Sequence, residues 1–349
     1  MTIGRDRLRN PVIPAICLLA LAYSPAAAWD EDGHIIITRA AFVKLPESMP
    51  HWLRTAEVRA RLEYLSTEPD RWRGQHNVHL DHINNPDHYI DEESLHPYGL
   101  SIKTLPLFRR EFTDILATER ALHPDKFASY DRSRDRSYTR LSPGLLPYRI
   151  AEIQWRIAGC WTTLKTYEKH PDLVTQDMID NARQNIIYHM GILSHYVGDG
   201  SQPLHTTEHH HGWVGPNPKG YTQEHEFHQY IDGGIILHHG FTPESVAKKA
   251  LPPRTISQED YWKEIGAYLY ETFEQVEPLY ALEKSGELRS EAGKRFIENR
   301  LLSAGAMLSG VWSAAHEGAR IDEFRENQLE EKKRSREQQK KKRIEKKAA

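Results

Sequence analysis

Two histidine–aspartate pairs constrain this chain more than any other feature of its sequence. His195 is followed by Asp199, and His228 by Asp232, each at an interval of four residues. On an α-helix, residues four apart lie on one face, about 5–6 Å apart at Cβ. A neutral imidazole and a carboxylate so placed can bind one divalent cation. The spacing therefore predicts two helical segments that each carry a pair of metal ligands.

The distribution of histidine extends this prediction to more than one ion. The chain has 20 histidines in 349 residues, and they cluster at 76–88 and 189–239. His205 follows the first pair beside a Gln-Pro turn and is a further candidate ligand. Adjacent residues cannot easily point at one ion, so the run from His209 to His211 has either a rim or substrate-contact role or none.

The first 28 residues have the pattern of a secretory signal peptide. A positive start precedes a short apolar run from Val12 to Tyr23 and a small-residue cleavage site at residues 26–28. The apolar run is too short for a stable membrane anchor, although an uncleaved anchor is the alternative. We expect a secreted or periplasmic protein that begins at Trp29 after cleavage near Ala28.

This cleavage would create a metal ligand at the new N-terminus. The free α-amine of Trp29 and its own carbonyl can form a five-membered chelate, and His34 can add a third ligand. The metal site would then be incomplete until the signal peptide is removed. The alternative is that Trp29 is an ordinary anchor of the fold and His34 an ordinary residue at a helix start.

Two further segments contribute candidate groups. Asp70 and Arg73 are close in space whether they lie in a turn or at a helix start. One histidine of the 76–88 cluster is expected to bind metal. His88 is favoured because Tyr89, Ile90 and Asp91 follow it, and His82 is the second choice.

Apolar periodicity predicts helices throughout the body of the chain. The longest are expected at 145–170, 174–197, 258–284 and 290–315, with shorter ones at 35–44, 51–66 and 223–232. Strand and hairpin signals are missing. We predict an all-α fold, with a single domain over residues 29–323 whose helices pack around a metal cleft.

Charge separates this body from a C-terminal tail. The chain has 39% apolar and 27% charged residues and a net charge of −3, but residues 324–349 contain eleven Lys and Arg against five Glu. After removal of the signal, the body carries −11, so it has no broad basic face for duplex nucleic acid. The Lys-rich tail is either a solvated appendage or an electrostatic tether to nucleic acid or an anionic membrane.

The candidate ligands have an order that resembles a known superfamily. In sequence they are Trp29, His34, Asp70, His88, His195, Asp199, His205, His228 and Asp232. This order is similar to that of the trinuclear zinc hydrolases, which comprise single-strand-specific zinc nucleases and bacterial zinc-dependent phospholipases C. The most specific parts are the run from His195 to His205, with its Gln-Pro-Leu-His end, and the Trp-x-x-x-x-His start of the mature chain. The match spans about Trp29 to Asp232.

The resemblance implies three Zn²⁺ ions. One would be bound by the side chains Asp70, His88, His195 and Asp199. A second would be bound by the amine and carbonyl of Trp29 with His34 and Asp199, so that Asp199 bridges the pair. The third would be bound by His205, His228 and Asp232. Such ions activate water against a phosphate ester, and no side-chain nucleophile is needed.

Several features resemble the nuclease branch. Arg73 lies three residues after Asp70, where nucleases place a phosphate-contacting arginine, and the last ligand is an Asp. The resemblance implies catalytic roles for Asp70, Arg73 and Asp199, and a base-binding role for Tyr89 and Asp91. One departure is the lack of the nuclease Gly-Gly-Asn segment in the loop at 211–220, which bears on base recognition.

Three functional hypotheses follow. The first is an exported zinc-dependent phosphodiesterase that acts as a nuclease or 3′-nucleotidase on single-stranded nucleic acid or nucleotides. The second is a phospholipase C that hydrolyses phospholipid headgroups. The third is a metal-binding structural protein without turnover, which would lose its fold on chelation. No protein partner is implied, and we expect a monomer.

Overall fold

Helices form nearly all of the regular structure. The computed structural model describes residues 29–75, 77–257 and 259–348, and the predicted signal peptide and its cleavage site precede them. Within these ranges the one β-bridge joins Ile90 to Gly144. The prediction of an all-α, single-domain fold is confirmed. The α-helices are α1 Glu31–Phe42, α2 Ala56–Leu65, α3 Glu68–Arg73, α4 Val78–Asn84, α5 Glu92–Leu95, α6 Arg109–Leu122, α7 Leu146–Lys169, α8 Gln176–Asp199, α9 Phe227–Gln229, α10 Ile235–His239, α11 Pro243–Ala247, α12 Tyr261–Phe273, α13 Val276–Ser285, α14 Glu291–Gly318 and α15 Glu323–Ala348.

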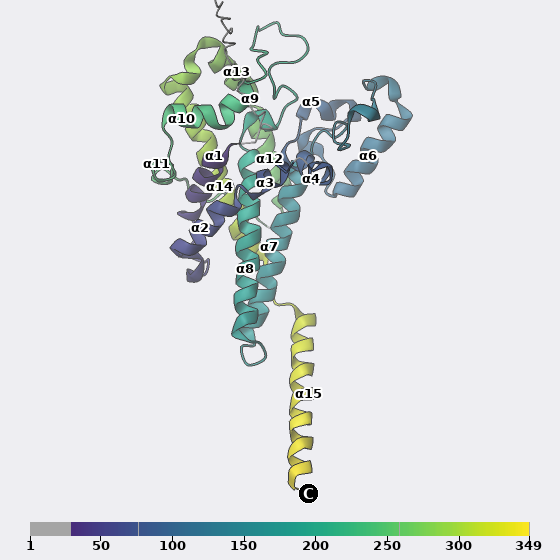
Figure 1. The fold of residues 1–349 in the computed structure, drawn as a ribbon, viewed down its shortest axis with the longest axis vertical. Coiled ribbons are helices and arrows are strands. Elements are labelled where there is room, and N and C mark those ends of the chain that lie inside the picture. Colours follow the sequence, from purple (N-terminus) through teal and green to yellow (C-terminus); the bar gives the residue numbers. More distant parts are fainter. Residues whose placement is uncertain (1–28, 76, 258, 349) are drawn as a thin grey trace, which may run out of the picture.

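The antiparallel pair α7 and α8 forms the axis of the molecule (Figure 1). Helix α8 begins where the Thr175 side chain accepts a hydrogen bond from the Met178 backbone N–H. Its apolar residues recur every three or four positions, so Ile186, Met190 and Leu193 are all buried against the core. Burial of each such side chain stabilises the fold by about 1.5–3 kcal/mol.

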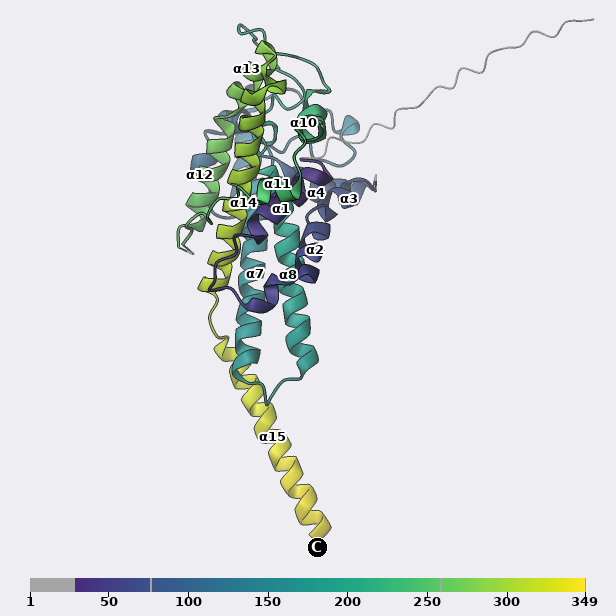
Figure 2. The ribbon, with the colours of Figure 1, turned by 90° about the vertical axis from the view of Figure 1, so that its left-hand side faces the viewer.

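The last turn of α8 is buried on every side, which positions the site. Helix α1 packs against both α8 and α14, and α2 packs along α8 (Figure 2). The buried Trp312 of α14 donates its indole N–H to the carbonyl of Met190 at 3.3 Å. Polar side chains near residue 199 are therefore enclosed by helices that come from distant parts of the sequence.

Three predicted helices differ from those observed. The helix expected at 258–284 is two helices, because Pro278 would clash with the carbonyl of Glu274 in a continuous helix. The segment 51–66 is a 3₁₀ turn followed by α2, with Thr55 as the N-cap between them. In the segment 223–232 the helix starts only at Phe227, since residues 222 and 223 instead hydrogen-bond to the loop at Trp213.

The tail is a helix, α15, that projects beyond the turn between α7 and α8 (Figures 1 and 2). Its first turns contact α7, where Glu326 pairs with Lys169 and His170, and Arg325 donates to the Tyr167 hydroxyl. Residues 335–346 are exposed. Among the described residues, none of the helices combines the length and apolar character needed to cross a bilayer.

Candidate metal centre

The predicted pair on α8 is present and buried. His195 and Asp199 are both inaccessible to solvent, with Nε2 of the imidazole 3.4 Å from Oδ2 of the carboxylate. The Nδ1–H of His195 donates to the carbonyl oxygen of Ser66 at 2.8 Å. This bond leaves the lone pair on Nε2, which faces Asp199, as the metal-binding atom.

Asp70 and His88 converge on this pair from two other segments. His88 Nδ1 lies 3.0 Å from both His195 Nε2 and Asp199 Oδ2. Asp70 Oδ1 lies 3.8 Å from His195 Nε2 and 4.0 Å from His88 Nδ1. Ligands about 2.0–2.1 Å from a tetrahedral zinc ion are about 3.3 Å apart. Asp70, His88 and His195 have ligand atoms within 4.8 Å of one another and can hold one ion, and Asp199 Oδ2 lies beside the two histidines of this group.

His34 forms a second group with the same aspartate. Its Nε2 lies 3.4 Å from Asp199 Oδ1, and its ring stacks on that of His195 with centroids 4.0 Å apart. The two oxygens of Asp199 thus face different groups, Oδ2 toward His88 and Oδ1 toward His34. With its oxygens placed in this way, Asp199 could contribute a ligand atom to each of two ions.

Trp29 lies beside this second group. Its side chain is fully buried, and the indole N–H donates to Ser201 Oγ, two residues beyond Asp199, at 2.9 Å. The next residue, Asp30, donates its backbone N–H to the carbonyl of Asp232 at 3.1 Å. The start of α1 is therefore held against both predicted His–Asp pairs, while the cleavage that would free the Trp29 amine lies outside the described residues.

The third group consists of His205, His228 and Asp232. The Nε2 atoms of the two histidines are 3.0 Å apart, and His228 Nε2 is 3.4 Å from Asp232 Oδ2. His205 donates from Nδ1 to the carbonyl of His88 at 2.7 Å, which turns its Nε2 toward His228. The other oxygen of Asp232 accepts from Gln202 at 2.7 Å. A π-helical turn at Tyr230–Gly234 carries the aspartate, a distortion often found at functional sites.

The electrostatics of these groups fit bound cations. Burial raises the pKa of Asp199 and of Asp232 well above the ordinary carboxyl value, and it lowers the pKa of His205 to about 3. Among the described residues, both ring nitrogens of His34, Oδ1 of Asp199 and Oδ2 of Asp232 are buried without a hydrogen bond. Buried polar atoms normally have such bonds, and a cation would satisfy these. Three buried groups of histidine and aspartate in this structure can therefore hold metal ions.

The structure separates the two candidate histidines of the 76–88 cluster. His82 is exposed on α4, and its Nδ1 lies 2.7 Å from the carbonyl of Ser137. His88 is buried in the first metal group. His88, unlike His82, therefore belongs to a group that could hold a metal ion, and its role as a ligand stays a prediction.

A cleft of about 460 Å³ opens above the metal groups. His88, His205 and His228 line it together with Arg73, Tyr89 and Asp91. Arg73 Nη1 lies 3.3 Å from Asp70 Oδ1, so its charge is next to the first group. The Tyr89 hydroxyl donates to the carbonyl of Ser142 at 3.3 Å. Asp91 is buried, and its Oδ1 has no hydrogen bond in the described part of the chain.

The sequence did not show which histidines of the run 209–211 face the cleft. His210 and His211 line the cleft, whereas His209 stacks on Trp213 with centroids 3.9 Å apart. The run of adjacent histidines also left open whether it has a role at the cleft. The carbonyl of Ser66, which orients His195, was missed because a backbone acceptor leaves no sequence signal.

Comparisons with known proteins add no assignment to this site. No family model matches the chain, and no curated protein matches it. The function has to be inferred from the geometry of the metal groups and of the cleft.

Proposed function

We propose that this protein is an exported, zinc-dependent phosphodiesterase that hydrolyses P–O ester bonds in single-stranded nucleic acid or nucleotides. The observation that carries the proposal is the position of Asp199, whose two oxygens face His88 and His34 in separate ligand groups. A third group with His205 lies on the same cleft. These positions support the ligand arrangement that the resemblance to the trinuclear zinc hydrolases implies.

Imidazole and carboxylate ligands suit zinc. When bound, paired zinc ions lower the pKa of water to make a nucleophile near neutral pH, and a third offsets charge on phosphoryl oxygens. The chain's own residues orient the ligands and the substrate. His195 and His205 are held by the carbonyls of Ser66 and His88, and the Arg73 guanidinium at the cleft offers donors to a phosphate.

Two cleft residues support a nucleic-acid substrate. Tyr89 offers an aromatic ring at the cleft wall, and stacking on such a ring is a sequence-tolerant way to bind a single-stranded base. Asp91 also lines the cleft, and a carboxyl group at this wall can hydrogen-bond to the edge of a base. For a phospholipase C, an exposed aromatic at the cleft mouth would be expected. Trp213 is instead packed on His209 and donates to the carbonyl of Pro216.

The proposal is tested with purified protein whose N-terminus has been determined. We expect a start at Trp29, about three zinc ions per chain by elemental analysis, and chelator-sensitive hydrolysis of denatured DNA and RNA. Phosphatidylcholine in vesicles is the comparison substrate. Turnover of the lipid alone would establish a phospholipase C. Bound zinc without cleavage of either substrate would instead support a structural metal protein.

A further inference from the structure

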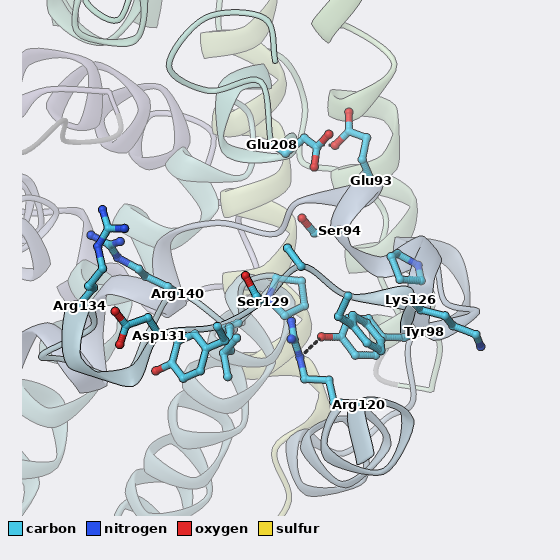
Figure 3. Close-up of a pocket in the computed structure, with 17 residues that line it drawn as sticks. Glu93, Ser94, Tyr98, Arg120, Lys126, Ser129, Asp131, Arg134, Arg140 and Glu208 are labelled. Carbon is cyan, nitrogen blue, oxygen red and sulfur yellow. Dashed lines mark hydrogen bonds between the residues drawn. The ribbon is translucent and has the colours of Figure 1, made fainter. Parts of the chain in front are cut away.

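A second hollow, of about 570 Å³, adjoins the metal cleft (Figure 3). We call it the loop hollow, because residues 126–143 form much of its wall. Ser94, Arg140 and Ser142 line both the loop hollow and the metal cleft. A ligand longer than one nucleotide can therefore extend from one into the other.

Two arginines on one wall of the loop hollow form no ion pair with an acidic residue among the described residues. Arg134 and Arg140 lie side by side in Figure 3, and neither guanidinium has a hydrogen bond or ion pair within the described part of the chain. The buried Asp135 stabilises their loop. Its carboxylate accepts hydrogen bonds from the backbone N–H groups of Thr139 and Arg140 and from the Tyr130 hydroxyl. Asp131 also lies on this wall, where it accepts from the backbone N–H and the hydroxyl of Ser133. Two cations and one anion leave the wall with a net positive charge, which suits a phosphate.

Partly exposed aromatic rings form another part of the wall. Phe127 and Tyr130 both line the loop hollow. The Phe127 ring packs against Tyr98, with centroids 4.8 Å apart, and the Arg120 guanidinium lies 4.6 Å from its centroid. Rings fixed in this way can stack on a base without reading its identity.

The opposite end of the loop hollow is acidic, with Glu93 and Glu208 close together (Figure 3). Glu93 accepts from the Thr207 hydroxyl at 2.7 Å and from the Glu208 backbone N–H at 3.1 Å. These carboxylates repel a phosphate, whereas the arginines attract it. A nucleotide is therefore expected to bind in the orientation that places its phosphate at the arginines.

We propose that the loop hollow is a subsite for a neighbouring nucleotide of a single strand whose scissile phosphate lies in the metal cleft. The adjacent phosphate binds at Arg134 and Arg140, and the base stacks on Phe127 or Tyr130. This inference rests on the proposed function, and it narrows the substrate class from nucleotides in general to oligonucleotides.

The test measures binding of a labelled single-stranded phosphorothioate hexanucleotide to the zinc-loaded protein at several salt concentrations. Arg134→Ala should weaken binding about 10-fold and reduce the slope of log K against log salt by about 0.7, the effect of losing one phosphate contact on a single strand. Arg136→Ala is the matched control, since this exposed arginine of the same loop is not part of the wall. Phe127→Leu should weaken binding without changing the slope, because stacking is uncharged.

The outcomes separate the subsite from the catalytic proposal. Equal effects of Arg134→Ala and Arg136→Ala, or no effect of either, would overturn the subsite. So would a wild-type protein that hydrolyses bis(p-nitrophenyl) phosphate but neither binds nor cleaves the oligonucleotide. Binding that depends on Arg134, in a protein that cleaves no phosphodiester with zinc bound, would support the subsite and refute the proposed function.

Discussion

The Asp199 carboxylate is enclosed by imidazoles from three parts of the chain. One oxygen lies 3.0 Å from His88 Nδ1 and the other 3.4 Å from His34 Nε2. Burial raises its pKa well above the ordinary range, and the nearby Asp70 raises it further. An anion is tolerated there only if positive charge accompanies it, which makes this residue the most sensitive test of metal binding.

We therefore expect Asp199→Asn to lower phosphodiesterase activity by at least about 100-fold, since changes to groups that merely support metal ligands already cost 10–100-fold. An amide is neutral and binds zinc poorly, so the zinc content should fall as well. The control is Asp177→Asn, in the exposed first turn of α8. Unchanged turnover and zinc content in Asp199→Asn would contradict the assignment of Asp199 as the ligand that bridges two ions.

Arg73 provides a second test at the scale of one residue. Its guanidinium lines the cleft beside Asp70. Arg73→Ala should reduce kcat/KM for a phosphodiester by about 100-fold, the usual effect of removing one donor to a developing charge, without removing zinc. Arg71→Ala is the control, because Arg71 is on the same helix but pairs with Glu68 and Glu31. If both variants behave alike, Arg73 has no special role.

At the scale of the element, helix α8 can carry the site because side chains of other helices pack very close to the backbone of its last turn. A Cβ added to Gly198 would lie 2.8 Å from Nδ1 of His34. Glycine is otherwise less favourable than alanine within a helix by about 0.8–1.0 kcal/mol. Glycine at position 198 therefore lowers the helix propensity of α8, but it leaves the space that the His34 ring occupies.

Gly198→Ala should consequently displace His34 and reduce the zinc content by about one ion per chain. Gly159→Ala in α7 is a matched control, since a Cβ there meets nothing within 4 Å. The control should keep its zinc and gain up to about 1 kcal/mol in free energy of unfolding. Full zinc occupancy in Gly198→Ala, measured by elemental analysis, would contradict this account of His34.

At the scale of the whole molecule, metal and protons compete for the same buried groups. The pKa values of Asp199 and Asp232 are raised by burial, while the pKa of His205 is lowered to about 3. Ligands bind zinc only when deprotonated. As pH falls, the carboxylates are therefore protonated first, at pH values above the ordinary carboxyl range, and the His205 imidazole stays neutral until about pH 3.

Protons and zinc compete for these carboxylates, so the apparent affinity for zinc should begin to fall on acidification while the pH is still above the ordinary carboxyl pKa of 3.8. Zinc content after dialysis should fall together with the difference in Tm between the zinc-loaded and the chelated protein, because a ligand that binds only the folded state stabilises it. An apparent zinc affinity that stays constant down to the ordinary carboxyl range would show that these pKa values are not raised.

The sequence by itself determined most of the helices and the pairing of ligands four residues apart, since both follow from local spacing. The interval from His195 to Asp199 places two ligands on one face of any helix, and the apolar periodicity around them predicts the helix. Only the tertiary structure decided which distant groups meet. It brings Asp70 and His88 to His195, and His34 to Asp199, and it leaves His82 at the surface. It also places the loop hollow beside the cleft. The physical reason is that contacts between remote segments depend on how whole helices pack, and no local pattern of residues encodes that packing.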